Sequence, residues 1–159
     1  MPVYAWELKG KHTMSTLYVV ATPIGNLQDM TPRALETLRG CALIAAEDTR
    51  VTRKLLTHFD IRVPLVSCHR HNEARRSDEI IARMLEEGID VALTCDAGTP
   101  AVSDPGYALV DAAWGAGIRV VPICGPSALT AALSASGFDA REFAFYGFLP
   151  RSLHWCFCL

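Results

Sequence analysis

Three short segments of the chain combine glycine, proline and polar residues in a way that suits the binding of a small ligand. They are residues 22–32 (TPIGNLQDMTP), 94–106 (TCDAGTPAVSDPG) and 122–131 (PICGPSALTA). Glycine permits positive φ angles and lets backbone N–H and C=O groups approach a ligand closely, while proline fixes the shape of a loop. One such segment alone is explained equally well as a turn. Three of them, each after a predicted strand, favour a binding cleft.

The motifs of several common ligand sites are absent from the sequence. No G-x-G-x-x-G follows the first predicted strand and no G-x-x-x-x-G-K-[ST] occurs, which excludes the usual dinucleotide and P-loop sites. The G-x-G at 115–117 lies at the end of a predicted helix that leads into a strand, which is the wrong place for the glycine loop of an ordinary Rossmann-type cofactor site. The G-x-S-x-G of a hydrolase nucleophile elbow is also missing. The three segments therefore predict a cleft of another kind.

The formal net charge of −2 conceals an uneven distribution of charge. Residues 50–76 carry a net charge of +5, which leaves −7 for the rest of the chain. The cations of this stretch are Arg50, Arg53, Lys54, Arg62, Arg70, Arg75 and Arg76. A basic stretch attracts phosphates because their counterions are released. Charge alone, however, favours the simpler explanation of a solvent-exposed helix face.

Hydrophobic periodicity predicts strands that alternate with helices from Thr16 onward. The predicted strands are residues 16–22, 41–47, 63–67, 90–96 and 118–124. The predicted helices are residues 31–40, 49–58, 73–87, 105–117 and 127–136. This alternation predicts an α/β fold, with a mainly parallel sheet and helices on both faces. Ligands of such sheets bind beyond the carboxyl ends of the strands, where the three segments lie.

Residues with known preferences for helix ends mark two of the predicted boundaries. Thr31 is a suitable N-cap with Pro32 at the first helical position, and Gly40 ends that helix. Asp104 and Pro105 predict the start of the fourth helix in the same way.

The six cysteines are predicted to be reduced and to hold no metal. Cys41, Cys68, Cys95 and Cys124 occur singly within or at the end of apolar runs, where a buried thiol behaves as a small hydrophobic group. The C-x-C at 156–158 lacks the paired spacing of a zinc site.

The composition, with 50% hydrophobic and 20% charged residues, is typical of a folded globular domain. No apolar run reaches the roughly 18 residues that a membrane-spanning helix needs, and no secretory signal is recognisable. We therefore expect a cytoplasmic protein without membrane contact.

Five segments together resemble a known enzyme family. They are residues 21–34 (ATPIGNLQDMTPRA), 45–50 (AAEDTR), 71–73 (HNE), 96–106 (DAGTPAVSDPG) and 120–128 (VVPICGPSA). In order and spacing they resemble the bacterial 16S rRNA cytidine 2′-O-methyltransferase family of the tetrapyrrole methylase superfamily. The resemblance extends from Leu17 to about Arg151. In the porphyrin-directed branches the second loop typically reads G-D-P, and A-E-D-T-R is not expected.

The resemblance implies a homodimeric enzyme that transfers a methyl group from S-adenosylmethionine to a cytidine 2′-hydroxyl in the RNA of the small ribosomal subunit. The residues expected to contact the methyl donor are Pro23, Ile24, Gly25, Ala97, Gly98, Thr99, Val102, Ser127 and Ala128. Arg50 and Arg53, which adjoin the A-E-D-T-R motif, are expected to contact RNA phosphate.

Because a sulfonium already activates the methyl group, the protein's task in such a reaction is mainly to align the acceptor. A ribose hydroxyl is a poor nucleophile, so a base within about 3 Å of it would assist the transfer. The candidate bases in the family motifs are Asp29, Glu47, Asp48, His71 and Glu73. Structural roles are also open to them, since Glu47 and Asp48 can cap the following helix and His71 can begin the next. The sequence does not rank these candidates.

The resemblance divides the chain into three parts. Residues 1–15 are expected to be an N-terminal extension, residues 16–150 the N-terminal domain of a tetrapyrrole-methylase-like fold, and residues 151–159 an atypical tail. Family members continue with a second domain that supplies the other wall of the donor cleft, so the chain alone is expected to be a weak or inactive catalyst. Two alternatives stay open: a methylase of tetrapyrroles or other small molecules, and a non-catalytic nucleotide-binding or dimerisation module.

Overall fold

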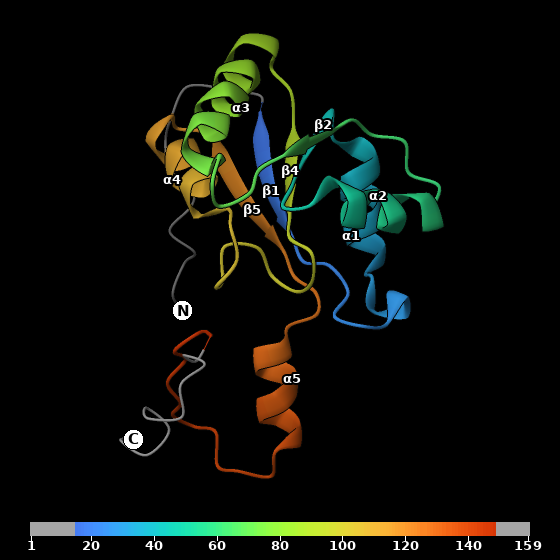
Figure 1. Ribbon diagram of the computed structural model, residues 1–159, viewed down its shortest axis with the longest axis vertical. Helices are drawn as coiled ribbons and strands as arrows, with labels where there is room; N and C mark the ends of the chain where they lie inside the picture. Colours follow the sequence, from blue (N-terminus) through green and yellow to red (C-terminus); the bar gives the residue numbers. More distant parts are fainter. Residues whose placement is uncertain (1–14, 149–159) are drawn as a thin grey trace, which may run out of the picture.

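Five strands form one parallel sheet in the order β3-β2-β4-β1-β5 (Figure 1). The strands are β1 (Thr16–Val20), β2 (Leu43–Ala46), β3 (Leu65–Ser67), β4 (Val91–Thr94) and β5 (Arg119–Ile123). Each lies within its predicted range. β1 pairs with both β4 and β5, so it lies inside the sheet although it comes first in the sequence. The predicted parallel α/β fold is confirmed.

The computed structural model describes residues 15–148. Apart from Ser15, the expected N-terminal extension lies outside the described residues, as do the expected tail and its two cysteines. No helix within the described part of the chain has both the length and the apolar character needed to cross a membrane.

Helices cover both faces of the sheet, as Figure 1 shows. The helices are α1 (Pro32–Gly40), α2 (Thr49–His58), α3 (Glu73–Glu87), α4 (Tyr107–Gly115) and α5 (Ala128–Ala135), with a short 3₁₀ turn at Leu27–Asp29. On one face α1 and α2 pack through Leu38 and Leu56 against Ile44 of the sheet. On the other face α3 and α4 pack through Met84 and Leu109. Each apolar stripe is therefore buried against the sheet.

Local signals set the ends of the first three helices. The Thr31 hydroxyl accepts a hydrogen bond from the Ala34 N–H at 3.1 Å, with Pro32 in the first turn. Asp48 caps α2 by accepting from the Arg50 N–H at 2.8 Å. Gly88, with φ of 66°, ends α3 in the left-handed conformation that glycine adopts at little cost.

The predicted start of α4 at Asp104 and Pro105 is wrong. The helix begins at Tyr107 and its N-cap is Gly106, whose φ of 127° is accessible only to glycine. The preceding residues instead form a turn in which the Ala101 N–H donates to the Pro105 carbonyl at 3.3 Å. Asp104 and Pro105 therefore lie in this turn and not in the first turn of α4.

The prediction of buried cysteines holds for three of the four described thiols. Cys41, Cys68 and Cys95 are buried, whereas Cys124 is exposed. Cys124 directly follows β5, an edge strand, so no further strand covers it there. All four are free thiols.

The last described helix, α5, differs from the others in having no buried residue, and in Figure 1 it extends away from the sheet. The segment 138–148 that follows it exposes large apolar side chains, among them Phe138 and Phe148, each 82% exposed. This part of the chain contributes little to the two cores.

Candidate functional site

The loops that follow β1 and β4 are joined directly to each other. Thr22 and Gly98 form an antiparallel bridge with reciprocal backbone hydrogen bonds of 2.8 and 3.0 Å. The buried Thr22 hydroxyl also donates to the Cys95 carbonyl at 3.1 Å. These contacts make the two loops one unit at the carboxyl ends of adjacent parallel strands, where α/β sheets bind ligands.

The larger of two cavities at this edge has a volume of about 420 Å³. It joins all three glycine- and proline-containing loops and includes seven of the nine predicted donor-contacting residues: Ile24, Ala97, Gly98, Thr99, Val102, Ser127 and Ala128. Ile24 lies close to the second loop, because a Cβ on Gly98 would be 3.5 Å from its Cγ2 atom. The loops after β1, β4 and β5 therefore meet around one space.

The other two predicted donor contacts, Pro23 and Gly25, do not line the larger cavity. They line a smaller, neighbouring cavity of about 310 Å³ between the first loop and α2. The first loop thus separates the two cavities, with Ile24 in the larger and its two neighbours in the smaller.

Strain is concentrated in the second loop where it borders the larger cavity. Ala101 and Ser103 have φ angles of 64° and 66°, and they flank Val102, a residue of the cavity wall. Left-handed conformations are costly for residues other than glycine and tend to occur at functional sites. The conformation of this loop therefore supports the assignment of the cavity as a functional site.

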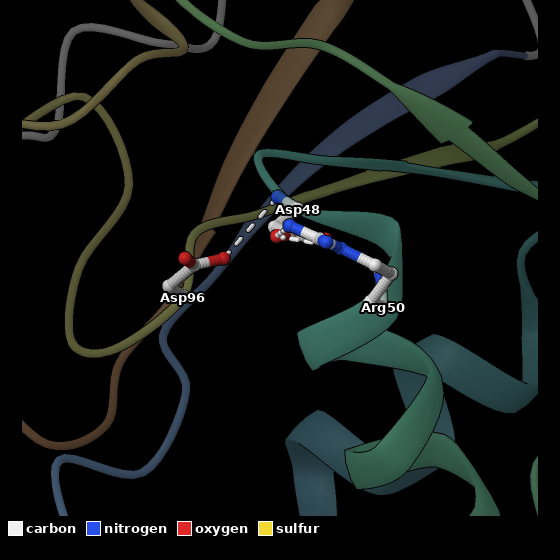
Figure 2. Close-up of polar contacts among 3 residues, drawn as sticks. All are labelled: Asp48, Arg50 and Asp96. Atoms are coloured by element: carbon white, nitrogen blue, oxygen red, sulfur yellow. Dashed lines mark hydrogen bonds and ion pairs between the residues drawn. The ribbon is translucent and has the colours of Figure 1, made fainter.

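Hydrogen bonds of two acidic residues, Glu47 after β2 and Asp96 after β4, hold the ends of these strands together. The Asp96 N–H donates to Oε2 of Glu47 at 3.3 Å, and Oδ1 of Asp96 accepts from the Asp48 N–H at 3.2 Å. Figure 2 shows the second of these bonds and the ion pair of Asp48 with Arg50. The hydrogen bonds thus position two carboxylates at the larger cavity, since Glu47 and Asp96 both line it.

The environments of these carboxyl groups differ. Burial raises the pKa of Glu47, and the charges of Asp96 and Asp104 act in the same direction. The pKa of Asp96 is also raised, chiefly by burial and further by Asp48 and Asp104. By contrast, hydrogen bonds from Arg50 lower the pKa of Asp48 to about 2. Glu47 and Asp96 are therefore the more basic carboxylates.

The structure separates the five candidate bases. Glu47 lines a cavity, whereas Asp48 is hydrogen bonded to Arg50. Asp29 is exposed in the 3₁₀ turn. His71 is exposed in the turn before α3, where its N–H donates to Nδ1 of His69 at 3.2 Å. Glu73 binds the N-terminus of α4 through its carboxylate.

Sequence reasoning missed Asp96, the residue that lines both cavities. Its sequence signal was its place as the first charged residue after β4, at the start of D-A-G-T-P. The bond that ties it to the end of β2 joins residues 48 positions apart and has no local signature.

The basic stretch contains both paired and unpaired cations. Arg50, Arg62, Arg75 and Arg76 form ion pairs with acidic neighbours. Within residues 15–148, Arg53 and Lys54 form no ion pair, and both are exposed on α2. Lys54 also lines the smaller cavity. Of the exposed cations without an ion pair in the described residues, which also include Arg70, Lys54 therefore lies at the candidate site.

A sequence profile of the family described as Tetrapyrrole (Corrin/Porphyrin) Methylases matches residues 16–152. The chain belongs to this family. Among solved structures, members of similar fold include the uroporphyrin-III-C-methyltransferase of Thermus thermophilus, with a TM-score of 0.57 and 24% identity over 76% of this chain and 50% of that one. A conserved hypothetical protein from Aeropyrum pernix K1 gives a TM-score of 0.58 with 26% identity over 77% of this chain and 42% of that one. The predicted superfamily and fold are confirmed.

Other relatives are more similar to this chain in sequence than these two solved structures. Ribosomal RNA small subunit methyltransferase I of Xylella fastidiosa is 56% identical over 138 residues, which are 87% of this chain and 50% of the relative. The protein of the same name from Pseudomonas aeruginosa is 58% identical over 135 residues, which are 85% of this chain and 48% of the relative. The chain thus spans about half the length of these relatives.

Proposed function

We propose that the protein containing this chain transfers a methyl group from S-adenosylmethionine to the 2′-hydroxyl of a cytidine in small-subunit ribosomal RNA. The observation that carries the proposal is the chemistry of the larger cavity. Three carboxylates line it, those of Glu47, Asp96 and Asp104, and none of the described residues in its wall is lysine, arginine or histidine. Such a cavity favours a cationic ligand.

The residues present fit a donor of this kind. When bound, S-adenosylmethionine supplies a methyl group that its sulfonium has already activated. The three carboxylates attract its positive charges, and the backbone of residues 97–99 offers hydrogen-bonding groups beside Ile24. Ser127 and Ala128 close the cavity at the start of α5. Because the volume of about 420 Å³ lies in the usual range for small-molecule sites, the cavity suits a ligand of this size.

The names of the relatives and the cations of α2 support ribosomal RNA as the acceptor. Relatives with 56% and 58% identity are named as methyltransferases of the small ribosomal subunit RNA. Arg53 and Lys54 are exposed without ion pairs in the described structure, so they are free to bind phosphate. Arg50 forms an ion pair with Asp48 and would exchange this partner for a phosphate. We propose the cytoplasm as the site of action, where ribosomal RNA is found.

We also propose that the protein acts as a homodimer. The support is the exposed apolar surface of α5 and of residues 138–148, because large exposed apolar patches mark interaction surfaces. Light scattering on the protein expressed from its complete reading frame tests this assembly. A mass equal to one chain across the micromolar range would contradict it.

The decisive experiment measures methyl transfer by the protein expressed from its complete reading frame. Unmodified small subunits and S-adenosylmethionine with a labelled methyl group are the substrates, and the product is located by mass spectrometry of the RNA. We expect one 2′-O-methylcytidine and its loss on replacing Gly98 and Thr99, which line the larger cavity. The matched control is Gly115→Ala, at a helical glycine where an added Cβ meets no atom within 4 Å. In a parallel reaction a tetrapyrrole replaces the subunits, and label on the tetrapyrrole, with none on RNA, would favour the small-molecule alternative.

A further inference from the structure

The smaller cavity differs in chemistry from the larger one. Its walls are apolar on both sides: Pro23 and Leu27 come from the first loop, and Val51 and Leu55 from α2. Its polar lining residues are Thr22, Asn26, Thr52, Lys54 and Asp96. Apolar walls suit the face of a nucleobase, and an ammonium group suits a phosphate. A volume of about 310 Å³ is sufficient for one nucleotide.

The two cavities share a single residue among those that the structure describes. Asp96 is in the wall of both, at the carboxyl end of β4, whereas Glu47 lines only the larger cavity. A group transferred between a ligand in one cavity and a ligand in the other would therefore pass close to Asp96.

The side chain of Asp96 is held in place and still has a free acceptor. Its Oδ1 atom accepts from the Asp48 N–H at 3.2 Å, and its own N–H is bound by Glu47. Within the described residues its Oδ2 atom has no hydrogen-bond donor. Asp48, in comparison, has both carboxylate oxygens bound by Arg50.

We propose that the smaller cavity binds the acceptor nucleotide of the RNA and that Asp96 receives the proton of its 2′-hydroxyl. The proposal rests on the proposed function and adds to it the acceptor site and the base. In the balanced step, the bond between the 2′-oxygen and the methyl carbon forms as the sulfur–methyl bond breaks. The bonding electrons stay on sulfur, which becomes a neutral thioether, and the hydroxyl proton moves to the Asp96 carboxylate.

The first test needs neither methyl donor nor activity. Cytidine 5′-monophosphate, and separately a short RNA oligonucleotide containing cytidine, are titrated into the protein expressed from its complete reading frame and followed by NMR. We expect saturable shifts at residues of the smaller cavity. Val51→Trp, which fills the cavity, should raise the dissociation constant at least tenfold for both ligands. Thr57→Trp, at an exposed position of α2 that lines neither cavity, should leave it unchanged.

The outcomes of this titration decide the acceptor site. Shifts confined to the larger cavity, or equal affinities for Val51→Trp and Thr57→Trp, would overturn it. Binding of the free nucleotide without binding of the oligonucleotide would also overturn it, because the proposed ligand is a nucleotide within RNA.

The second test concerns the base. Asp96→Asn keeps an oxygen for the Asp48 N–H but cannot take a proton. We expect its kcat to fall at least 100-fold. Its affinity for S-adenosylhomocysteine, which lacks the sulfonium charge that the carboxylates attract, should change less than threefold in calorimetry. Its residual rate should rise with hydroxide concentration, whereas the rate of the unaltered protein should level off above the pKa of Asp96. Asp78→Asn, at an exposed position of α3, is the matched control and should retain full activity.

A kcat of Asp96→Asn within threefold of the unaltered protein, or an unchanged pH profile, would overturn the role of Asp96. If the unaltered protein methylates no RNA, the proposed function fails. In that event the nucleotide titration still shows whether the smaller cavity is a nucleotide site.

Discussion

The Oε1 atom of Glu73 accepts a hydrogen bond from the backbone N–H of Gly106 at 2.7 Å. The same oxygen accepts from the Ala108 N–H at 2.8 Å, so one carboxylate binds two donors at the N-terminus of α4. The N-cap of α4 is Gly106, which has no side chain that could bind these N–H groups. Glu73, the first residue of α3, therefore joins two helices on the same face of the sheet. This carboxylate is engaged in structure and is a poor choice for a base.

The first prediction is that Glu73→Ala lowers stability without a specific effect on chemistry. Loss of a charged cap should lower the free energy of unfolding by about 1 to 2 kcal/mol, because the Gly106 and Ala108 N–H groups lose their acceptor. Urea denaturation measures the change, and Glu86→Ala, at an exposed position of the same helix, should change stability by less than about 0.5 kcal/mol. Loss of methyl transfer at unchanged stability would instead return Glu73 to the candidate bases.

The second prediction concerns Gly98, which has a φ of 89° in the larger cavity. Gly98→Ala should lower the free energy of unfolding by about 1 to 2 kcal/mol, because a Cβ is disfavoured in the left-handed region. The added Cβ also narrows the cavity beside Ile24, so affinity for S-adenosylhomocysteine should fall. Calorimetry and urea denaturation check the two effects. Gly115→Ala should show neither, and wild-type affinity in Gly98→Ala would contradict the proposed donor site.

Helix ends that depend on neighbouring residues could be predicted from the sequence. Thr31 and Asp48 cap α1 and α2 from the adjacent position, and Gly88 ends α3 in the same local manner. The start of α4 could not be predicted, because the side chain that binds its first N–H groups is that of Glu73, which lies 33 residues before Gly106. Local propensity favoured Asp104 and Pro105, and a tertiary contact determined the outcome.

The candidate site, like the helix ends, could be predicted from the sequence only in part. The glycine- and proline-containing loops were predicted to follow parallel strands. Because such strands bring their carboxyl ends to one edge of the sheet, Ile24, Gly98 and Ser127 could be expected to line one cavity, as they do. The division of the edge into two cavities did not follow, because it depends on which way each side chain of the first loop points. For the same reason Glu47 could not be ranked over Asp48 from the sequence, and Asp96 could not be identified.

The third prediction uses the raised pKa values of Glu47 and Asp96, to which the charge of Asp104 contributes. Asp104→Asn should lower both pKa values, as carbon-detected NMR of the carboxyl groups would measure. A carboxyl group whose pKa is raised by folding binds its proton more tightly in the folded state, so its contribution to stability decreases as pH rises through that pKa. Asp104→Asn should therefore stabilise the protein at neutral pH, and the gain should vanish below the unfolded-state pKa values. An equal gain at pH 3 and pH 7 would contradict this account.

The fourth prediction concerns thiol reactivity. Burial raises the pKa of Cys95 to about 12, with Asp104 and Glu47 adding to the effect, and burial likewise raises those of Cys41 to about 12 and Cys68 to about 11. Since the thiolate is the reactive form, iodoacetamide at pH 8 should leave these three unmodified in the folded protein. The exposed Cys124 should react. Peptide mapping identifies the modified sites, and alkylation of Cys95 at the rate of Cys124 would show that the second loop opens.

The fifth prediction tests whether Arg53 binds RNA phosphate. Binding of a phosphate by a cation releases a counterion, so Arg53→Ala should reduce the slope of log affinity against log salt by about 0.7 to 0.9. Arg62→Ala is the matched control, because it removes the same charge from the same basic stretch but from a side chain paired with Asp60. Fluorescence titration of the protein with a labelled fragment of small-subunit RNA at several salt concentrations measures both slopes. Equal slopes for the two variants would mean that net charge alone attracts the RNA, and the specific role of Arg53 would then be wrong.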